Sequence, residues 1–413
     1  MKKKRNKESE FDYASFKSSA LESLQAGEPL LGEGGILKDL IKDLVEGALD
    51  GEMDAHLSSE KKLGNSNRRN GHTKKQLRTE AGDISIQPPR DRQGSFTPLL
   101  VEKWERNLGS GLDHQVLELY SLGNSYEDIQ THLEQMYGVS LSKGQLSAIT
   151  DRVWPKIVEW QKRALESLYL VVFLDAIHFK VREEGQVQTK AVYTVYGVDV
   201  EGNRDVLGLK VGQAEGAKEW GRILETLKDR GVEDVLFFAI DGLPGFKEAI
   251  LDIFPHSTIQ RCVVHMVRSS LRFVDEADAK AVAKALRAIY TAEDETAGKL
   301  ALDAFDQAWG KKYPEIVTAW QNNWIELTAF FGFNWAVRKL IYTTNAVEGL
   351  HRLMRKTTKT KAAFVNDKAL LKLLFLSLER KKKVWARKIH SYKAVQRSLI
   401  REFGQRIEKH LKI

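Results

Sequence analysis

Two strongly apolar segments, each followed directly by an aspartate, most constrain what this chain can fold into. Residues 168–174 are all apolar and rich in β-branched and aromatic types, and Asp175 follows them. Residues 235–240 repeat the pattern before Asp241, after which a Gly-Leu-Pro-Gly turn opens a helix. Such uninterrupted runs are typical of strands that are buried on both faces of a sheet. Open α/β sheets build their sites at the carboxyl ends of strands, so we expect both strands to end here and the two carboxylates to converge.

The patterns around these segments predict a larger α/β core. Two further strand-like runs, 190–200 and 205–211, lie between them, and apolar residues at three- and four-residue steps predict a helix over 215–230. Three strands, a helix and a strand in this order are typical of a ribonuclease-H-like core. Residues 266–335 carry only helical patterns, so we expect an all-helical insertion in that core.

Charge indicates the kind of partner. The 413 residues are enough for two or three domains, and 64 basic against 56 acidic residues leave a net charge of +8. The excess is clustered, which favours a polyanionic partner. A single cysteine excludes an internal disulfide framework, and we find neither a signal peptide nor a bilayer-length apolar run. We therefore expect a cytoplasmic protein with no membrane partner.

Two segments concentrate the basic residues. Between 60 and 92 nine Lys and Arg stand among four acidic residues, and between 352 and 393 fourteen stand among two. Lysine and arginine that contact a nucleic-acid backbone release its counterions, which is the functional interpretation. A solvated basic surface is the alternative for each segment. The candidate contacts are Arg68, Arg69, Lys74, Lys75, Arg352, Arg355 and Lys356.

Residues 111–160 predict a pair of helices. Ser125 precedes an amphipathic run that Gly138 breaks, and Ser142 and Gln145 have the spacing of a capping box before the next helix. This spacing is that of a helix-turn-helix, in which Lys143 is a candidate DNA contact. An ordinary helical hairpin is the alternative, and the basic segment just upstream favours DNA binding.

A third carboxylate completes a candidate catalytic site. A helix that begins near residue 345 would place Glu348 in its first turn. A site for two Mg²⁺ ions needs carboxylates from separate elements, because both ions must keep positions open for substrate oxygens. Asp175, Asp241 and Glu348 together meet this need. For each carboxylate alone, a role as a cap or a surface charge is the better explanation, and the combination of all three favours the metal site.

Cys262 and His265 have Cys-x-x-His spacing where a short strand runs into a helix. They make only half a zinc site, since structural zinc needs four ligands and the chain has no second cysteine. We expect this pair to organise the junction beside Asp241 and to bind no metal.

Taken in order, several motifs resemble the Mutator-like family of bacterial insertion-sequence DNA transposases, which have an Asp-Asp-Glu catalytic core. The matching motifs are Arg69-Asn-Gly-His, Leu174-Asp-Ala-Ile, Asp241-Gly-Leu-Pro-Gly-Phe-Lys-Glu-Ala-Ile, Gln260-Arg-Cys-Val-Val-His and Tyr342-Thr-Thr-Asn-Ala-Val-Glu. The chain departs from the family at His351, where Asn is common, and at Asn334-Trp335, where a Pro usually follows an aromatic residue.

The resemblance implies a ribonuclease-H-like core with an all-helical insertion, preceded by a helical DNA-binding region. It implies that Asp175, Asp241 and Glu348 hold two Mg²⁺ ions, with Mn²⁺ as a substitute, and that Cys262 and His265 are the family's signature pair. It further implies recognition of terminal inverted repeats, DNA strand cleavage and strand transfer into target DNA, and a nucleoid-associated homo-oligomer that is a dimer on DNA. Trp324 resembles an insertion-domain tryptophan that stabilises an unpaired base.

The expected domains follow from these assignments. They are a flexible basic N-terminus over 1–34, an N-terminal DNA-binding region over 35–110, a helix-turn-helix-like region over 111–160, the first part of the catalytic core over 161–268, the all-helical insertion over 269–335, and the second part of the core with basic C-terminal helices over 336–413. Two alternatives remain. A ribonuclease-H-like nuclease or resolvase would not need the long helical regions, and a non-catalytic DNA-binding regulator would not need all three carboxylates.

Overall fold

The computed structural model describes residues 12–30, 34–62, 64–79, 81–101, 111–137, 139–213, 216–342 and 344–410. The rest of the chain lies outside this description, including Gly138 and residues 1–11 and 31–33 of the terminus that we expected to be flexible. The chain divides into two compact units, Met1–Arg152 and Val153–Ile413. Each unit has a hydrophobic core of its own.

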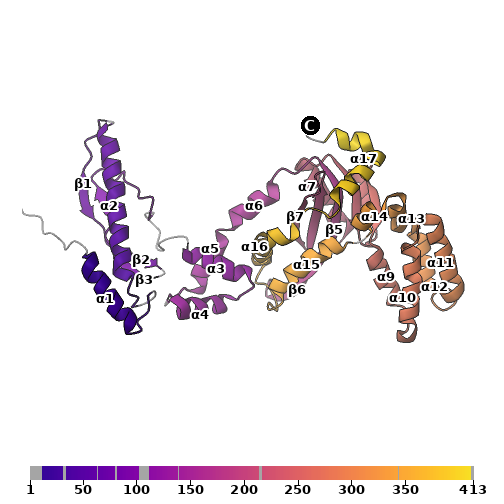
Figure 1. Ribbon diagram of the computed structural model, residues 1–413, viewed down its shortest axis with the longest axis horizontal. Coiled ribbons are helices and arrows are strands. Elements are labelled where there is room, and N and C mark those ends of the chain that lie inside the picture. Colours follow the sequence, from indigo (N-terminus) through magenta and orange to yellow (C-terminus); the bar gives the residue numbers. More distant parts are fainter. Residues whose placement is uncertain are drawn as a thin grey trace, which may run out of the picture. The chain divides into compact units, whose positions relative to one another are not determined.

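The first unit begins with helices α1 (Tyr13–Gln25) and α2 (Lys38–Lys62). Four short strands follow, β1 (Arg69–His72), β2 (Lys75–Thr79), β3 (Gly82–Ile86) and β4 (Pro89–Asp91). Strand β1 pairs with β4 and β2 with β3, both antiparallel. Figure 1 labels β1, β2 and β3 beside α2. The expectation of a helical region is therefore wrong for residues 69–91. Alternating apolar side chains of β2 and β3, including Leu77, Ile84 and Ile86, pack on Val45 and Leu49 of α2, so burial favours strands here.

Three helices complete the first unit, α3 (Gly111–Ser121), α4 (Tyr126–Tyr137) and α5 (Lys143–Asp151). The capping box at the start of α5 is confirmed, because Ser142 Oγ accepts from the Gln145 amide while the Gln145 side chain accepts from the Ser142 amide. Tyr126 of α4 bonds Thr150 of α5 through their hydroxyl groups at 2.8 Å. The predicted pair is thus present, with α3 packed against both helices.

The second unit is built on a five-stranded mixed sheet. Helix α6 (Trp154–Lys162) leads into β5 (Leu168–Glu183), β6 (Gln186–Asp199) and β7 (Arg204–Gly212). Helix α7 (Ala217–Asp229), strand β8 (Asp234–Ile240), helix α8 (Phe246–Ile253) and strand β9 (Thr258–Arg261) follow. The strand order is β7-β6-β5-β8-β9, in which β5, β6 and β7 are antiparallel neighbours and β8 and β9 run parallel to β5.

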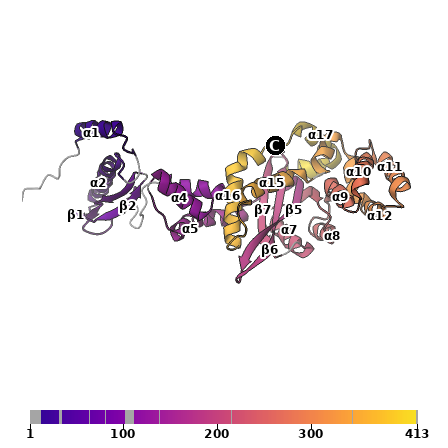
Figure 2. The same ribbon diagram turned by 90° about the horizontal axis from the view of Figure 1, so that it is seen from below.

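One face of this sheet is covered by α7 and α8, and α7 is the helix predicted over 215–230. The apolar side of α7 is buried against the sheet, together with Phe246 and Ile250 of α8. The buried residues of α7 are Trp220, Ile223, Leu224 and Leu227. Three later helices, α15 (Asn345–Thr358), α16 (Asp367–Trp385) and α17 (Tyr392–Glu408), lie on the opposite face (Figure 2). Both faces are covered, which explains why the central strands are apolar throughout.

Strand β5 does not end at Asp175, contrary to expectation. It continues to Glu183 as one arm of a long hairpin, and Asp175 pairs with Thr194 of β6. Only the parallel ladder between β5 and β8 stops short of Asp175, at the pair Phe173 and Ala239. Asp175 therefore lies at the end of a strand pairing and in the interior of a strand.

Residues 263–342 contain helices and no strand, and every one of these residues is described. The elements are α9 (Val263–Leu271), α10 (Glu276–Tyr290), α11 (Glu295–Trp309), α12 (Pro314–Asn322), α13 (Trp324–Thr328), η1 (Ala329–Gly332) and α14 (Trp335–Ile341). No helix among the described residues is long and apolar enough to cross a membrane.

Candidate active site

Asp175 and Asp241 occupy equivalent positions on the neighbouring strands β5 and β8. Each lies two residues beyond the last parallel pair, Phe173 and Ala239. Because side chains alternate along a strand, the Asp175 carboxylate projects on the same face as Phe173. His351 of α15 meets Asp175 on that face. Asp241 is the first residue after β8, and it lines a pocket with residues of β9 and α8.

His351 of α15 connects the Asp175 carboxylate to strand β6. Its Nδ1 lies 3.4 Å from Asp175 Oδ2, and its Nε2 lies 2.9 Å from Thr194 Oγ1. Burial, followed by the charge of Arg355, lowers the pKa of His351 to about 3. The ring is therefore neutral at neutral pH and has one N–H. Since a carboxylate only accepts, we infer that Nδ1 donates to Asp175 and that Nε2 accepts from the Thr194 hydroxyl.

Asp241 keeps an unpaired oxygen beside a polar pocket. Its Oδ1 is buried and has no hydrogen-bond partner. The pocket has a volume of about 390 Å³ and is lined by Asp241 and Gly242 after β8, by Arg261 of β9, and by Asn323 between α12 and α13. Arg261 packs against Gly242 so closely that an added Cβ would lie 1.8 Å from its Nη2. A side chain at position 242 would displace this guanidinium.

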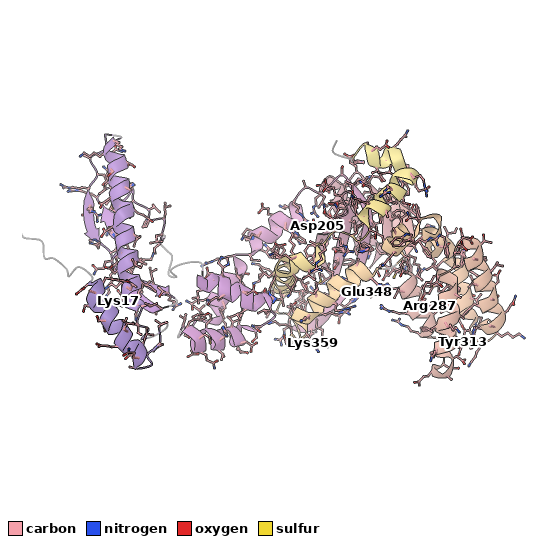
Figure 3. All side chains as sticks on the ribbon, in the orientation of Figure 1. Lys17, Asp205, Arg287, Tyr313, Glu348 and Lys359 are labelled. Carbon is pink, nitrogen blue, oxygen red and sulfur yellow. The ribbon has the colours of Figure 1, made fainter. Side chains whose placement is uncertain are left out.

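Glu348 lies in the first turn of α15 (Figure 3) and is held by cations of α9. Arg268 donates to Oε1 at 2.7 Å and to Oε2 at 3.3 Å, and His265 Nε2 lies 3.2 Å from Oε1. The Cys262 side chain beside the ring, followed by the Asp175 and Glu348 carboxylates, raises the pKa of His265 to about 9 against the effect of burial. His265 is therefore positively charged at neutral pH, so Glu348 faces two cations.

Cys262 joins three elements around these carboxylates. It is the N-cap of α9, where its Sγ accepts from the His265 amide at 3.5 Å. The same sulfur accepts from the amide and the hydroxyl of Thr344, the residue before α15, at 3.4 and 3.3 Å. Its own amide donates to Ile240 O at 2.7 Å, at the end of β8. These contacts suit a structural junction beside Asp241, and the absence of zinc stays a prediction.

The structure brings Asp175 and Glu348 near one another and places Asp241 after the neighbouring strand, without assembling a metal cluster. Asp175 is linked to α15 through His351, and Glu348 starts the same helix. Among the described residues, no group of three or more His, Cys, Asp or Glu side chains is arranged to hold a metal ion. In this structure the Glu348 carboxylate is directed to α9 by Arg268 and His265.

The predicted DNA contacts of the second unit lie on the helix that carries Glu348. Arg352, Arg355 and Lys356 of α15 are all exposed. Trp324 is the residue that, by resemblance, would stabilise an unpaired base. Its Nε1 donates to Glu295 Oε1 at 2.9 Å, and Lys299 Nζ lies 5.1 Å from the centre of its ring. The α15 cations are thus free to meet a phosphate, whereas the Trp324 ring is already covered by a lysine.

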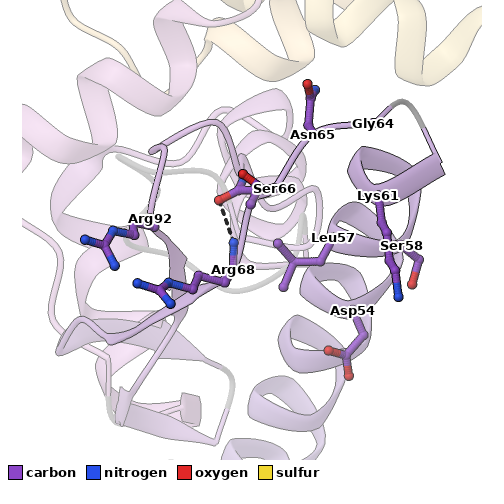
Figure 4. A pocket seen from close by; sticks show the side chains of 10 residues that line it. Asp54, Leu57, Ser58, Lys61, Gly64, Asn65, Ser66, Arg68 and Arg92 are labelled. Atoms are coloured by element: carbon purple, nitrogen blue, oxygen red, sulfur yellow. Dashed lines mark hydrogen bonds between the residues drawn. The ribbon is translucent and has the colours of Figure 1, made fainter.

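The first unit contains a basic hollow between the end of α2 and the strands (Figure 4). Its volume is about 940 Å³, and Lys61, Arg68 and Arg92 are among the residues that line it. The backbones of Arg68 and Arg92 are hydrogen bonded at 2.8 Å, so the two arginines are neighbours. Arg92 and Lys61 were not among the predicted contacts, although both belong to the basic segment 60–92.

The other predicted DNA contacts of the first unit differ in side-chain exposure and in whether they form ion pairs. Arg69 forms ion pairs with Asp50 and Asp54 of α2. Lys74 is exposed and Lys75 is half-buried. Lys143, at the start of α5, pairs with Glu127 of α4.

Comparisons with known proteins agree on the class of protein to which this chain belongs. Residues 14–388 match the family described as "Transposase, Mutator family". The chain is 41% identical over 391 residues to the transposase for insertion sequence element ISRM3 of Rhizobium meliloti (strain 1021), covering 94% of this chain and 98% of that protein. It is 40% identical to a probable insertion-sequence transposase of Corynebacterium diphtheriae, covering 70% and 84%.

A solved Drosophila P element transposase strand transfer complex is 9% identical and covers 76% of this chain and 88% of that chain, with a TM-score of 0.27, which is too low to support an argument. The class is established by the family match and by the two relatives named above, a transposase and a probable transposase of insertion sequences. The chain belongs to the Mutator family of transposases.

Proposed function

We propose that this transposase binds the terminal inverted repeats of an insertion sequence and catalyses Mg²⁺-dependent DNA strand cleavage and strand transfer, with Asp175, Asp241 and Glu348 as the catalytic carboxylates. One observation carries the proposal. Asp175 and Asp241 lie in equivalent register on adjacent parallel strands, and the helix that begins beside Glu348 contacts Asp175 through His351. In the proposed site these three carboxylates, from three separate elements, act together.

We also propose that the second unit is a ribonuclease-H-like core interrupted by a helical insertion. The strand order β7-β6-β5-β8-β9, with three antiparallel strands followed by two parallel ones, supports this assignment. The helices of residues 263–342 leave the sheet after β9, and α15 returns to pack on β5. An insertion at this point separates the two aspartates from Glu348 in sequence.

The residues fit two Mg²⁺ ions, or Mn²⁺ in their place. Carboxylate oxygens are the ligands that Mg²⁺ prefers, and a buried carboxylate oxygen without a partner, as Asp241 Oδ1 is, favours a cation or water beside it. Asp175, Asp241 and Glu348 would hold the ions. Bound there, they would supply activation of the attacking oxygen and stabilisation of the leaving oxygen.

The protein's own groups position the reactants. The His351 contact fixes one oxygen of Asp175, and the Ala176 amide donates to the other at 2.8 Å. The exposed Arg352, Arg355 and Lys356 follow Glu348 on the same helix, where they would hold phosphates flanking the cut. In the proposed reaction, water attacks the phosphodiester at the 3′ end of the element, which frees a 3′-OH on the element and leaves a 5′-phosphate on the flanking strand. This 3′-OH then attacks another phosphodiester, whose 3′ oxygen leaves as a new 3′-OH.

The first unit would recognise the element's ends. Its basic hollow and the helices α3, α4 and α5 are the features that suit backbone contacts and groove recognition. Two ends must be processed together, so we propose a homo-oligomer, a dimer on DNA.

Mapping of strand breaks on DNA carrying the parent element's ends tests this function. With Mg²⁺, the protein should nick at the 3′ ends and join them to a target, and without a divalent ion it should do neither. Cleavage at unrelated positions, with no joined product, would favour a nuclease. Binding to the ends with neither product would favour a regulator.

A further inference from the structure

The contact between Arg268 and Glu348 joins the start of α15 to the last turn of α9. The two residues are 80 positions apart, and the guanidinium reaches both carboxylate oxygens. We propose that Arg268 is a DNA-phosphate contact of the active site which Glu348 holds while no DNA is bound, and that its transfer to the substrate releases Glu348 for metal binding. This inference rests on the proposed function and names a further residue for it.

The pair occupies the oxygens that a metal ion would need. Glu348 Oε1 accepts from Arg268 and faces His265, and Oε2 accepts from the second Arg268 nitrogen. A cation binding to Glu348 must replace these donors. This agrees with the observation that no group of acidic, His or Cys side chains among the described residues is arranged to hold a metal.

Arg268 is placed to change partners. Its side chain is 57% exposed, whereas that of Glu348 is 20% exposed. Exposed ion pairs contribute little to stability, so the contact is easily exchanged. A phosphate group offers a guanidinium the same two-pronged geometry as a carboxylate and carries the charge of the proposed substrate. The exchange of a carboxylate for a phosphate therefore costs Arg268 little and frees the carboxylate.

The arrangement couples DNA binding to metal binding. If Arg268 binds either Glu348 or the DNA, DNA binding frees Glu348 and so favours metal binding, and metal binding frees Arg268 and so favours DNA binding. By linkage the coupling free energy is the same in both directions. An arginine with only a structural role would give no such coupling. The two interpretations therefore differ in binding measurements that need no catalysis.

Metal binding to the full-length, DNA-free protein is the first test. Titration with Mn²⁺, followed by the electron paramagnetic resonance signal of the free ion, compares wild type with Arg268→Gln. We expect the variant to bind Mn²⁺ about two- to fivefold more tightly, the range that corresponds to losing an exposed ion pair. Arg272→Gln is the matched control, because Arg272 is exposed at the end of the same helix and should leave Mn²⁺ affinity unchanged.

DNA binding is the second test, measured by fluorescence anisotropy with a labelled duplex carrying one terminal repeat, in EDTA. Arg268→Gln should weaken binding and reduce the slope of log affinity against log salt by about one. Glu348→Gln should not weaken it, because it frees Arg268. Opposite changes in metal and DNA affinity for one substitution are the signature of a shared cation.

The outcomes separate this inference from the proposed function. If Arg268→Gln leaves both affinities unchanged while Glu348→Gln weakens Mn²⁺ binding, the inference is overturned and Glu348 remains a metal ligand. If Glu348→Gln also leaves Mn²⁺ affinity unchanged, the assignment of Glu348 in the proposed function is overturned with it.

Discussion

The imidazole of His351 lies between the carboxylate of Asp175 and the hydroxyl of Thr194, with Nδ1 3.4 Å from Asp175 Oδ2. This contact links α15 to the central strand β5 at Asp175, the aspartate that follows the apolar run 168–174. Glu348 is three residues earlier on the same helix. The contact of His351 with Asp175 therefore also helps to fix the position of the Glu348 side chain relative to the sheet. The position of α15 on β5 is therefore part of the site.

Replacing His351 should reduce catalysis more than stability if its role is to orient Asp175. His351→Asn replaces the imidazole N–H with an amide N–H donor, and the resemblance places Asn at this position, so the variant should retain most activity. His351→Ala removes the donor and should lower the cleavage rate by about 10- to 100-fold, the usual effect of losing a group that orients a metal ligand. Single-turnover cleavage rates with thermal unfolding as a folding control would test this. Equal rates for the two variants and wild type would contradict it.

Arg68 and Arg69 should behave differently although they are adjacent. Arg68 lines the basic hollow, so Arg68→Ala should weaken DNA binding and lower the salt slope by about one. Arg69 is tied to Asp50 and Asp54, so Arg69→Ala should lower the stability of the first unit, by about 1 kcal/mol or less. Anisotropy titrations in a salt series and thermal melts measure the two effects. A larger loss of salt slope for Arg69→Ala than for Arg68→Ala would reverse the assignment.

The close approach of Arg261 makes Gly242 sensitive to the smallest substitution. Gly242→Ala places a Cβ 1.8 Å from the Arg261 guanidinium, so either this guanidinium must leave Asn323, to which it is bonded, or the loop after Asp241 must shift. We expect cleavage to fall at least tenfold, as displacement of a catalytic group by about 1 Å implies. Gly221→Ala is the control, since nothing lies within 4 Å of its added Cβ in α7 and alanine favours a helix. Cleavage assays of both variants test the loop's role, and wild-type rates for Gly242→Ala would refute it.

Cys262 should matter as a cap and not as a metal ligand. Cys262→Ser keeps an acceptor for Thr344 and the His265 amide, while Cys262→Ala removes it and should cost roughly 1 kcal/mol, as other lost caps do. Elemental analysis of the purified protein should find no stoichiometric zinc. One zinc per chain that disappears in Cys262→Ser would show that the junction is a metal site.

Several elements could be predicted because local patterns decide them. The four buried apolar residues of α7, the end of β8 before Asp241 and the Ser142 capping box all follow from spacing within a few residues. The extension of β5 was missed because the apolar run stops at Asp175. The alternation of buried Ile177, Phe179 and Val181 with exposed neighbours was the available signal for a hairpin strand.

Contacts between distant segments could not be predicted from spacing. Arg268 and Glu348 are 80 residues apart, and His351 meets Thr194 across 157 residues. Nothing local marks Arg268 among the 64 basic residues of the chain. Strands β1, β2 and β4 of the first unit are hard to predict because they are short and rich in charged residues, and packing on α2 decides the conformation of this region.

The cleavage and joining activity of carboxylate variants in Mg²⁺ tests the central claim most directly. Asp175→Asn, Asp241→Asn and Glu348→Gln keep shape and remove charge, so each should still fold and bind the element's ends. Each single variant should be as inactive as the triple variant, because the groups act as one unit. Asp252→Asn, an exposed position on α8 outside the site, should cut normally. Wild-type cleavage and joining by Glu348→Gln would contradict the assignment of this chain's active site.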